Sequence, residues 1–221
     1  GLCGVEEPWW KDLGINIGHV LCQDALHGLH KAFSDHNLKW LSTTVGKMVL
    51  DCHFRAQPHC SGFCGFPKGI SHISQWSGKE NHDVQCLILG ACVGSENASP
   101  AVICALWSHL DFIYLAQLPQ HSNATLHTMQ AHLHDSNLAR LVGKNGVINH
   151  MKFPKAHSPI HIFRNIRDTG VINNYSTETS ETIHIDACKD PWCESNHRGY
   201  MQQVIHQLTQ HENIHAFSSY L

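Results

Sequence analysis

Carboxylate and histidine side chains that could bind a metal ion gather in two segments far apart in the sequence. The first, DALHGLHKAFSDH, begins at Asp24 and places His27 and His30 after it as D-x2-H-x2-H. The second, YSTETSETIHIDACKDP, contains Glu178 and Glu181. Carboxylate oxygens are the side-chain ligands that Mg²⁺ prefers. Each segment could therefore contribute ligands to a metal site.

Both segments also have a purely structural interpretation. An aspartate that begins a helix commonly caps it, because its side chain accepts hydrogen bonds from the first free backbone N–H groups. Glu178 and Glu181 lie one turn apart on an expected helix, as on a solvated face. His27 and His30 share a face with apolar residues, where packed histidines that hydrogen-bond locally are common. The residues alone leave both interpretations open.

A second group of possible ligands lies in the middle of the chain. His53, His59, Cys60 and Cys64 could together bind zinc, which takes cysteine sulfur and histidine nitrogen. Their spacing lacks the paired CxxC pattern of most structural zinc sites. A small His/Cys metal-binding protein is therefore one alternative for this sequence.

The composition indicates an ordered domain. The chain has 221 residues, 42% of them hydrophobic and only 15% charged, which is enough to bury one sizeable core. Its net charge of −3 is unlike that of a protein built around a strong phosphate-binding patch. Ten cysteines without a secretory signal favour free thiols in a nuclear or cytoplasmic protein that is not secreted. No apolar run is long enough to span a bilayer, so we expect no membrane partner.

Helical periodicity and helix-capping residues predict a mainly α chain. We expect helices over residues 24–35, 38–54, 80–92, 101–118, 123–142, 154–168, 177–188 and 200–217, and the start of another at 71–75. Residues 58–69 are rich in Pro and Gly and predict a loop, and GSENASP before residue 101 predicts a linker. The strand signal is limited to short stretches such as 147–151.

Several blocks of sequence resemble one known family in the same order. They are DALHGLHKAFSDHNLKW, LDCHFRAQPHCSGFCGFPKGISHISQWSGKENHDVQ, LWSHLDFIYLAQLPQHS, GVINHMKFPKAHS, the Glu178/Glu181 segment and ESNHRGY. Together they resemble the Plavaka-type transposases of the KDZ group, cut-and-paste DNA elements of basidiomycete fungi. The resemblance extends from about Asp24 to Leu221, and blocks in order are more specific than any single motif.

The resemblance implies an RNase H-like catalytic core with an Asp-Asp-Glu triad. Such a triad holds two Mg²⁺ ions that activate the nucleophile and stabilise the leaving oxygen during strand cleavage and transfer on DNA. It carries the second aspartate onto Asp24 and the glutamate onto Glu181, which would be both catalytic and metal-binding, with Glu178 as a weaker choice. Glu181 would project toward the metal with Ile185 and Cys188 packed below it.

Departures from the family pattern argue against activity. The first aspartate of the triad has no counterpart, because Asp12 does not stand in the family's strand context. Cys52 and His53 replace residues that are more often charged. Cys193 stands where an arginine is expected, and its loss would remove a phosphate-pairing group. The resemblance therefore implies weakened DNA binding as well as lost catalysis.

Arginine is scarce in this chain, which contains only Arg55, Arg140, Arg164, Arg167 and Arg198. His, Cys, Gln and Trp, each one transition from an arginine codon, are plentiful. C-to-T decay of a silenced element and ordinary compositional drift both explain this pattern.

These observations together predict a truncated, inactive remnant of a DNA transposase. It would comprise a helical insertion and the C-terminal portion of an incomplete RNase H-like α/β domain. We expect a core remnant at 1–40, the insertion at 41–150 and the catalytic-helix region at 151–221. Its partner would be DNA, with Mg²⁺ as the ancestral cofactor, no small-molecule substrate and an open oligomeric state. The alternatives are a domesticated, non-catalytic protein or nucleic-acid binding module, and the His/Cys zinc-binding protein.

Overall fold

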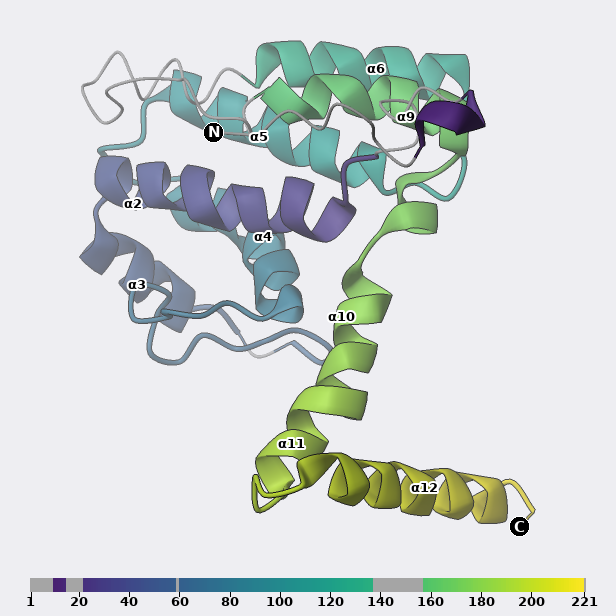
Figure 1. Cartoon of the computed structure of the whole chain (residues 1–221). Coiled ribbons are helices and arrows are strands. Elements are labelled where there is room, and N and C mark those ends of the chain that lie inside the picture. The colour runs from purple at the N-terminus through teal and green to yellow at the C-terminus, as the bar shows by residue number, and fades with distance from the viewer. Residues whose placement is uncertain (1–9, 15–21, 59, 137–156, 221) are drawn as a thin grey trace. The chain divides into compact units, whose positions relative to one another are not determined.

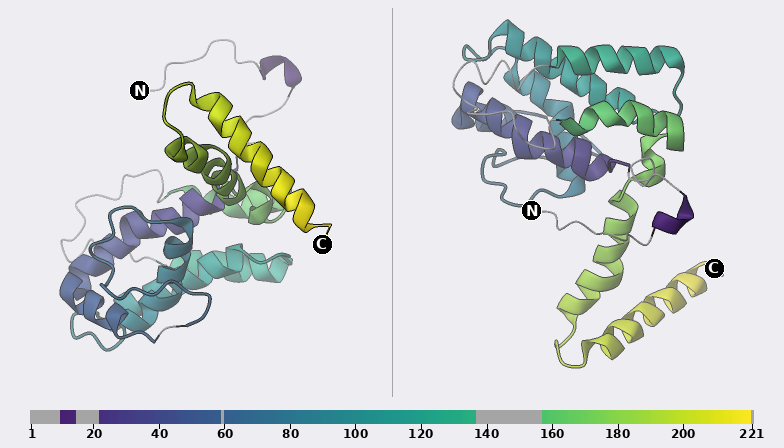
Figure 2. Two further views of the ribbon diagram at one scale, coloured as in Figure 1. Left: turned by 90° about the horizontal axis from the view of Figure 1, so that it is seen from below. Right: turned by 45° about the horizontal axis from the view of Figure 1, so that its top comes forward.

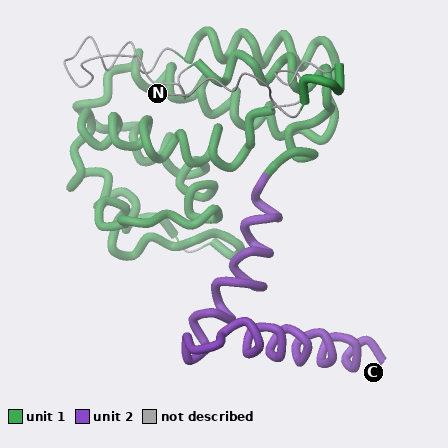
Figure 3. Tube along the Cα trace, viewed as in Figure 1, with its two compact units in different colours: residues 1–176 green, residues 177–221 purple. Residues whose placement is uncertain are grey.

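The computed structural model describes residues 10–14, 22–58, 60–136 and 157–220 as an assembly of helices, with no strand among them (Figure 1). The prediction of a mainly α chain is confirmed for this part of the chain. Two compact units divide after Ser176, one covering residues 1–176 and the other residues 177–221 (Figure 3). The predicted strand at 147–151 lies outside the described residues.

Unit 1 contains a long N-terminal helix that is partly widened into π turns. It begins after Asp24 and continues through η2 (Leu26–Lys31), η3 (Phe33–Leu38) and α2 (Lys39–Val45). The helix therefore ends ten residues after its predicted end at residue 35. It also continues without a break across residue 40, the expected boundary between the core remnant and the insertion. It stops at Gly46, whose φ of 99° is accessible mainly to glycine. The next helix, α3 (Lys47–Arg55), starts on the other side of this break.

Three further helices of unit 1 begin at side-chain caps. Ser77 and Glu80 form a capping box at the start of α4 (Gly78–Cys92), so this helix begins two residues before its predicted start at residue 80. Ser99 caps α5 (Pro100–Ala116), which follows the predicted GSENASP linker. Ser122 caps α6 (Asn123–Asp135), whose predicted start at residue 123 is confirmed. The expected helical start at 71–75 is wrong, because those residues form turns and bends.

The hydrophobic core lies between the N-terminal helix, α3, α4, α5 and α6. Its largest fully buried side chains are Phe33, Phe54, Phe112, Leu41, Leu50, Ile88, Leu106, Ile113, Met129, Ile162 and Ile172. Burying a side chain of this size contributes about 1.5–3 kcal/mol. These residues hold unit 1 together and fix the positions of the polar side chains among them.

The last part of unit 1 returns the chain to this core. It consists of η4 (Ser158–His161), α9 (Ile162–Thr169) and η5 (Ile172–Tyr175). Two views show α9 running beside α6 (Figures 1 and 2). Ser158 and Pro159 form the first turn, and Pro159 is buried.

Unit 2 is a helical hairpin with very little buried surface of its own. Its first arm runs through α10 (Glu178–His184), η6 (Ile185–Lys189) and α11 (Asp190–Glu194), and its second arm is α12 (Tyr200–Ser218). Both helices predicted in this region are confirmed. Asn196 and Gln203 bridge the corner through two hydrogen bonds of 3.1 and 2.7 Å.

The described residues contain no helix both long and apolar enough to cross a membrane.

Candidate functional site

Asp24 caps the N-terminal helix. Its carboxylate accepts hydrogen bonds from the backbone N–H of Leu26 at 3.3 Å and of His27 at 2.8 Å. One of its oxygens also lies 2.5 Å from Nδ1 of the His27 ring. The side chain is 17% exposed, so it lies mostly within the protein. These contacts are those of an N-cap aspartate, the structural alternative that the sequence left open.

His27 and His30 differ in their environments, although both lie on η2. The His27 side chain is 44% exposed and turns back to Asp24. His30 is buried, and its Nδ1 lies 2.8 Å from Oε1 of Gln85 on α4. In the D-x2-H-x2-H pattern, Asp24 and His27 therefore belong to a helix cap, while His30 forms a buried polar pair with Gln85. This agrees with the interpretation of His30 as a packed histidine that hydrogen-bonds locally.

Asp83 is a buried carboxylate that the sequence analysis did not single out. It accepts hydrogen bonds from the backbone N–H of Cys64 at 2.7 Å and from Nζ of Lys79 at 3.0 Å. A third contact, of 3.2 Å, comes from Nδ1 of His82. Burial acts to raise the pKa of Asp83, but these hydrogen bonds outweigh it and lower the pKa to about 2. Asp83 thus stays ionised and fastens the loop before α4.

Asp51 on α3 holds the other end of the same loop. Its carboxylate accepts the backbone N–H groups of Ile70 at 2.8 Å and Ser71 at 2.9 Å, and also the Ser71 hydroxyl. Partial burial favours a higher pKa, but the hydrogen bonds from Ser71 and Ile70 dominate and lower it. The loop rich in Pro and Gly therefore takes its shape from two carboxylates on flanking helices.

Glu181 lies on α10 in unit 2, where it is exposed along with Glu178. The side chains that were expected to pack below it do not do so, because Ile185 is 43% exposed and Cys188 is also exposed. The helix itself was predicted correctly from its periodicity. The periodicity does not show, however, whether other residues cover its apolar face. Asp24 and Glu181 belong to different compact units.

The surroundings of Asp24 do not fit a magnesium site. Mg²⁺ requires near-octahedral oxygen coordination and keeps several waters. The oxygens of Asp24 instead face N–H groups of its own helix and the His27 ring, which a cation would have to displace. Among the described residues, no group of three or more His, Cys, Asp or Glu side chains is placed to hold a metal ion.

His53 and Cys64, two of the proposed zinc ligands, lie in surroundings that oppose zinc binding. Nδ1 of His53 lies 2.6 Å from the carbonyl oxygen of Ala91. Burial and the neighbouring Asp83 raise the pKa of the Cys64 thiol, which opposes the thiolate form that binds zinc. Cys60 and Cys64 line an apolar groove of about 490 Å³ together with Cys86. His59 lies outside the described residues. All nine described cysteines are free thiols, as predicted.

A second groove, of about 410 Å³, lies between α6 and the segment formed by η4 and α9. It brings together Arg164 and Arg167, two of the five arginines of the chain, with His127 from the opposite helix. Nε of Arg164 donates to Asp168 at 3.2 Å on the same helix. Guanidinium groups suit phosphate because they present several N–H donors in a fixed plane. Arg164 and Arg167 already lie one turn apart on α9, and the pairing of α6 with α9 places His127 opposite them.

Comparisons with known proteins add no relative: no protein-family model, no curated protein and no solved structure matches this chain.

Proposed function

We propose that this chain derives from a Plavaka-type DNA transposase and does not cleave DNA. Support for the origin comes from the ordered blocks of resemblance between Asp24 and Leu221. In this proposal α10 corresponds to the catalytic helix of an RNase H-like domain, and the helices of unit 1 between residues 41 and 150 correspond to the insertion that precedes it. The ancestral reaction is Mg²⁺-dependent strand cleavage and transfer.

The hydrogen bonds that the Asp24 carboxylate accepts support the loss of cleavage. A catalytic carboxylate in a two-metal site must offer its oxygens to the ions. At Asp24 the oxygens accept two backbone N–H groups and contact the His27 ring. Binding a cation there would uncap the helix, at a cost of about 1 kcal/mol, and would break the contact with His27.

Incubation of the purified chain with supercoiled plasmid and Mg²⁺ or Mn²⁺ tests this proposal. We expect no nicking above that of a parallel preparation of Asp24→Asn/Glu181→Gln, which controls for contaminating nucleases. Nicking by the unmodified chain that the double variant lacks would refute the loss of cleavage. The origin is tested separately at the genomic locus, where terminal inverted repeats around the coding region are expected.

A second candidate function is binding of nucleic acid without chemistry, and the groove between α6 and α9 favours it. Arg164 and Arg167 lie one turn apart at this groove, with His127 opposite. Phosphate contacts of this kind make binding weaken as salt increases, with a log–log slope of about −0.9 per phosphate neutralised on duplex DNA.

Fluorescence anisotropy of a labelled duplex at several salt concentrations measures this slope. Arg164→Gln/Arg167→Gln should reduce its magnitude by about 2, one for each lost contact. Arg55→Gln is the matched control, because Arg55 lies on α3 and donates to Cys52 Sγ at 3.1 Å. Equal slopes for the double variant and the unmodified chain would exclude this groove as the binding site.

A further inference from the structure

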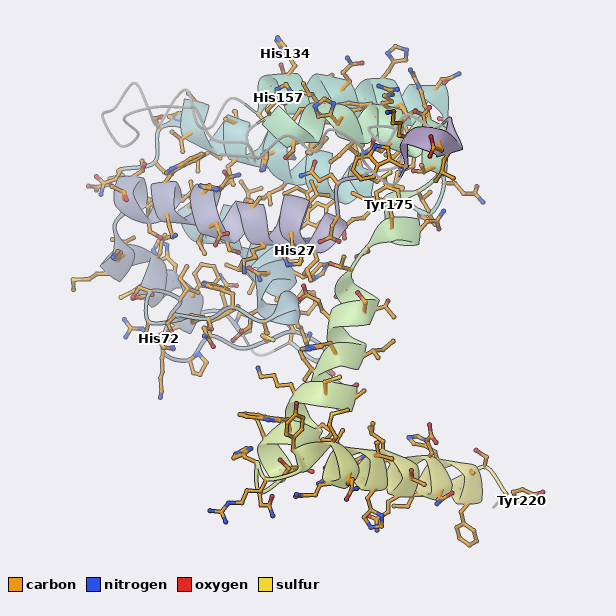
Figure 4. The ribbon with its side chains drawn as sticks, viewed as in Figure 1. His27, His72, His134, His157, Tyr175 and Tyr220 are labelled. Carbon is orange, nitrogen blue, oxygen red and sulfur yellow. The ribbon has the colours of Figure 1, made fainter. Side chains whose placement is uncertain are left out.

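His157 and His161 bring two imidazole nitrogens together on the surface of unit 1. Their Nε2 atoms lie 3.1 Å apart, and their ring centroids are 4.9 Å apart at an interplanar angle of 72°. The two residues are four positions apart at the start of the η4–α9 segment, so their side chains share one face. Both are exposed to solvent. Figure 4 labels His157 at this end of the segment.

The separation of the two nitrogens suits a shared metal ion. Zinc–imidazole bonds are about 2.0–2.1 Å long. Two such bonds to nitrogens 3.1 Å apart enclose an angle of about 98° at the metal, between a square-planar and a tetrahedral arrangement. Without a metal, the same pair requires one ring to donate Nε2–H while the other offers its lone pair. A cation replaces that single proton and binds both lone pairs.

The backbone that presents the two rings is held in place by buried neighbours. Pro159 is buried and Ile162 is 0% exposed, so the turn between the histidines is anchored in the core. Nε2 of Gln23 donates to the Ser158 hydroxyl at 2.8 Å. The two imidazoles therefore lose little further backbone freedom on binding, which favours chelation.

We propose that His157 and His161 form a bidentate site for a divalent transition-metal ion. Imidazole ligands suit Zn²⁺, Ni²⁺ and Cu²⁺, and the general affinity order places Cu²⁺ above the other two. The described residues supply no third His, Cys, Asp or Glu to this pair. The remaining coordination positions are therefore filled by water or by a donor from another molecule. The site is independent of the carboxylates discussed above.

Isothermal titration of the full chain with Zn²⁺ tests the proposal, after its exposed thiols are blocked with iodoacetamide and in a buffer that contains imidazole to suppress binding at single histidines. His157→Gln and His161→Gln should each weaken the tightest binding event at least tenfold, because either change destroys the chelate. The double variant should be no weaker than the single ones. Cu²⁺ should bind the unmodified chain more tightly than Zn²⁺ does.

His211→Gln/His215→Gln is the matched control, since this pair has the same spacing on α12 in unit 2. Circular dichroism of each variant verifies folding, which these exposed positions should leave intact. Unchanged affinity in His157→Gln and His161→Gln would overturn the proposal. A loss confined to one of the two single variants would also overturn it, because a chelate depends on both rings. A loss of the tightest binding event in His211→Gln/His215→Gln, but not in the two single variants, would overturn the proposal as well.

Discussion

Removal of the negative charge of Asp83 should destabilise unit 1 in a pH-dependent way. The carboxylate is 3% exposed and accepts hydrogen bonds from Cys64 and Lys79. Its pKa falls from 3.8 to about 2. Because one pKa unit corresponds to about 1.36 kcal/mol, the ionised form contributes about 2 kcal/mol to folding.

The sign of the pH dependence follows from the direction of this change. A carboxyl group whose pKa is lower in the folded state stabilises the protein above its unfolded pKa. The contribution of Asp83 is therefore complete near neutral pH and decreases as the pH falls from about 4 toward 2. About half of it should remain at about pH 3.

Urea unfolding of the unmodified chain and of Asp83→Asn at several pH values measures this contribution. We expect a difference in unfolding free energy of about 2 kcal/mol at neutral pH, shrinking toward the acid limit. Asp135→Asn is the control, because Asp135 has a side chain that is 66% exposed at the end of α6 and should change stability by less than about 0.5 kcal/mol.

Hydrogen exchange at the Cys64 amide supplies a local measurement, since this N–H donates to Asp83. Its protection should fall by about thirtyfold in Asp83→Asn, the equivalent of about 2 kcal/mol. A free-energy difference that stays constant from neutral pH to about pH 2.5 would refute the reasoning, and so would unchanged exchange at Cys64. In either case the loop would not depend on the charge of Asp83.

Three further changes test the packing of unit 1. Gly69→Ala should cost more than about 1 kcal/mol in urea unfolding, because Gly69 has a φ of +82° and an added Cβ would overlap the Asp51 side chain. Burial lowers the pKa of His109 from 6.5 to about 4. The contribution of His109 to folding stability is therefore complete above about pH 6.5, where the ring is neutral, and decreases as the pH falls toward 4. His109→Leu should flatten the stability profile over that range, and an unchanged profile would contradict the assignment. Phe54→Ala should cost about 3–5 kcal/mol because the ring is 1% exposed, and a loss below 1 kcal/mol would show that the site collapses around the cavity.

Local signals in the sequence predicted much of the helical fold. The predicted helix starts at residues 101 and 123 agree with the observed starts of α5 and α6, because a cap depends on residues within three positions of it. The break at Gly46 was missed because the stripe of apolar residues continues across it. The chain changes direction there through a single residue, Gly46, which has a positive φ. The turns at 71–75 were missed for a related reason. The backbone N–H of Ser71 at their start, like that of Ile70 before it, donates to Asp51, which lies about twenty residues earlier.

The candidate site was predictable only in part, because burial and partners depend on the assembled structure. The capping role of Asp24 was one of two interpretations available from the sequence, and its hydrogen bonds are those of a cap. Asp83 had a signal in the sequence, since Asn81, Asp83 and Gln85 are polar positions on a helix that otherwise packs apolar residues. Its bond to Cys64 joins residues 19 positions apart and had no local signal.

Four acidic residues in the blocks of resemblance have structural roles in unit 1 that do not require catalysis. Asp24 caps a helix, Asp51 and Asp83 fasten one loop, and Glu80 completes a capping box with Ser77. Each role alone is worth about 1–3 kcal/mol, a large share of the stability of a domain. Selection for folding would therefore preserve these blocks after cleavage is lost. For this reason the proposed origin and the proposed absence of cleavage are compatible, and the plasmid and genomic tests can give independent answers.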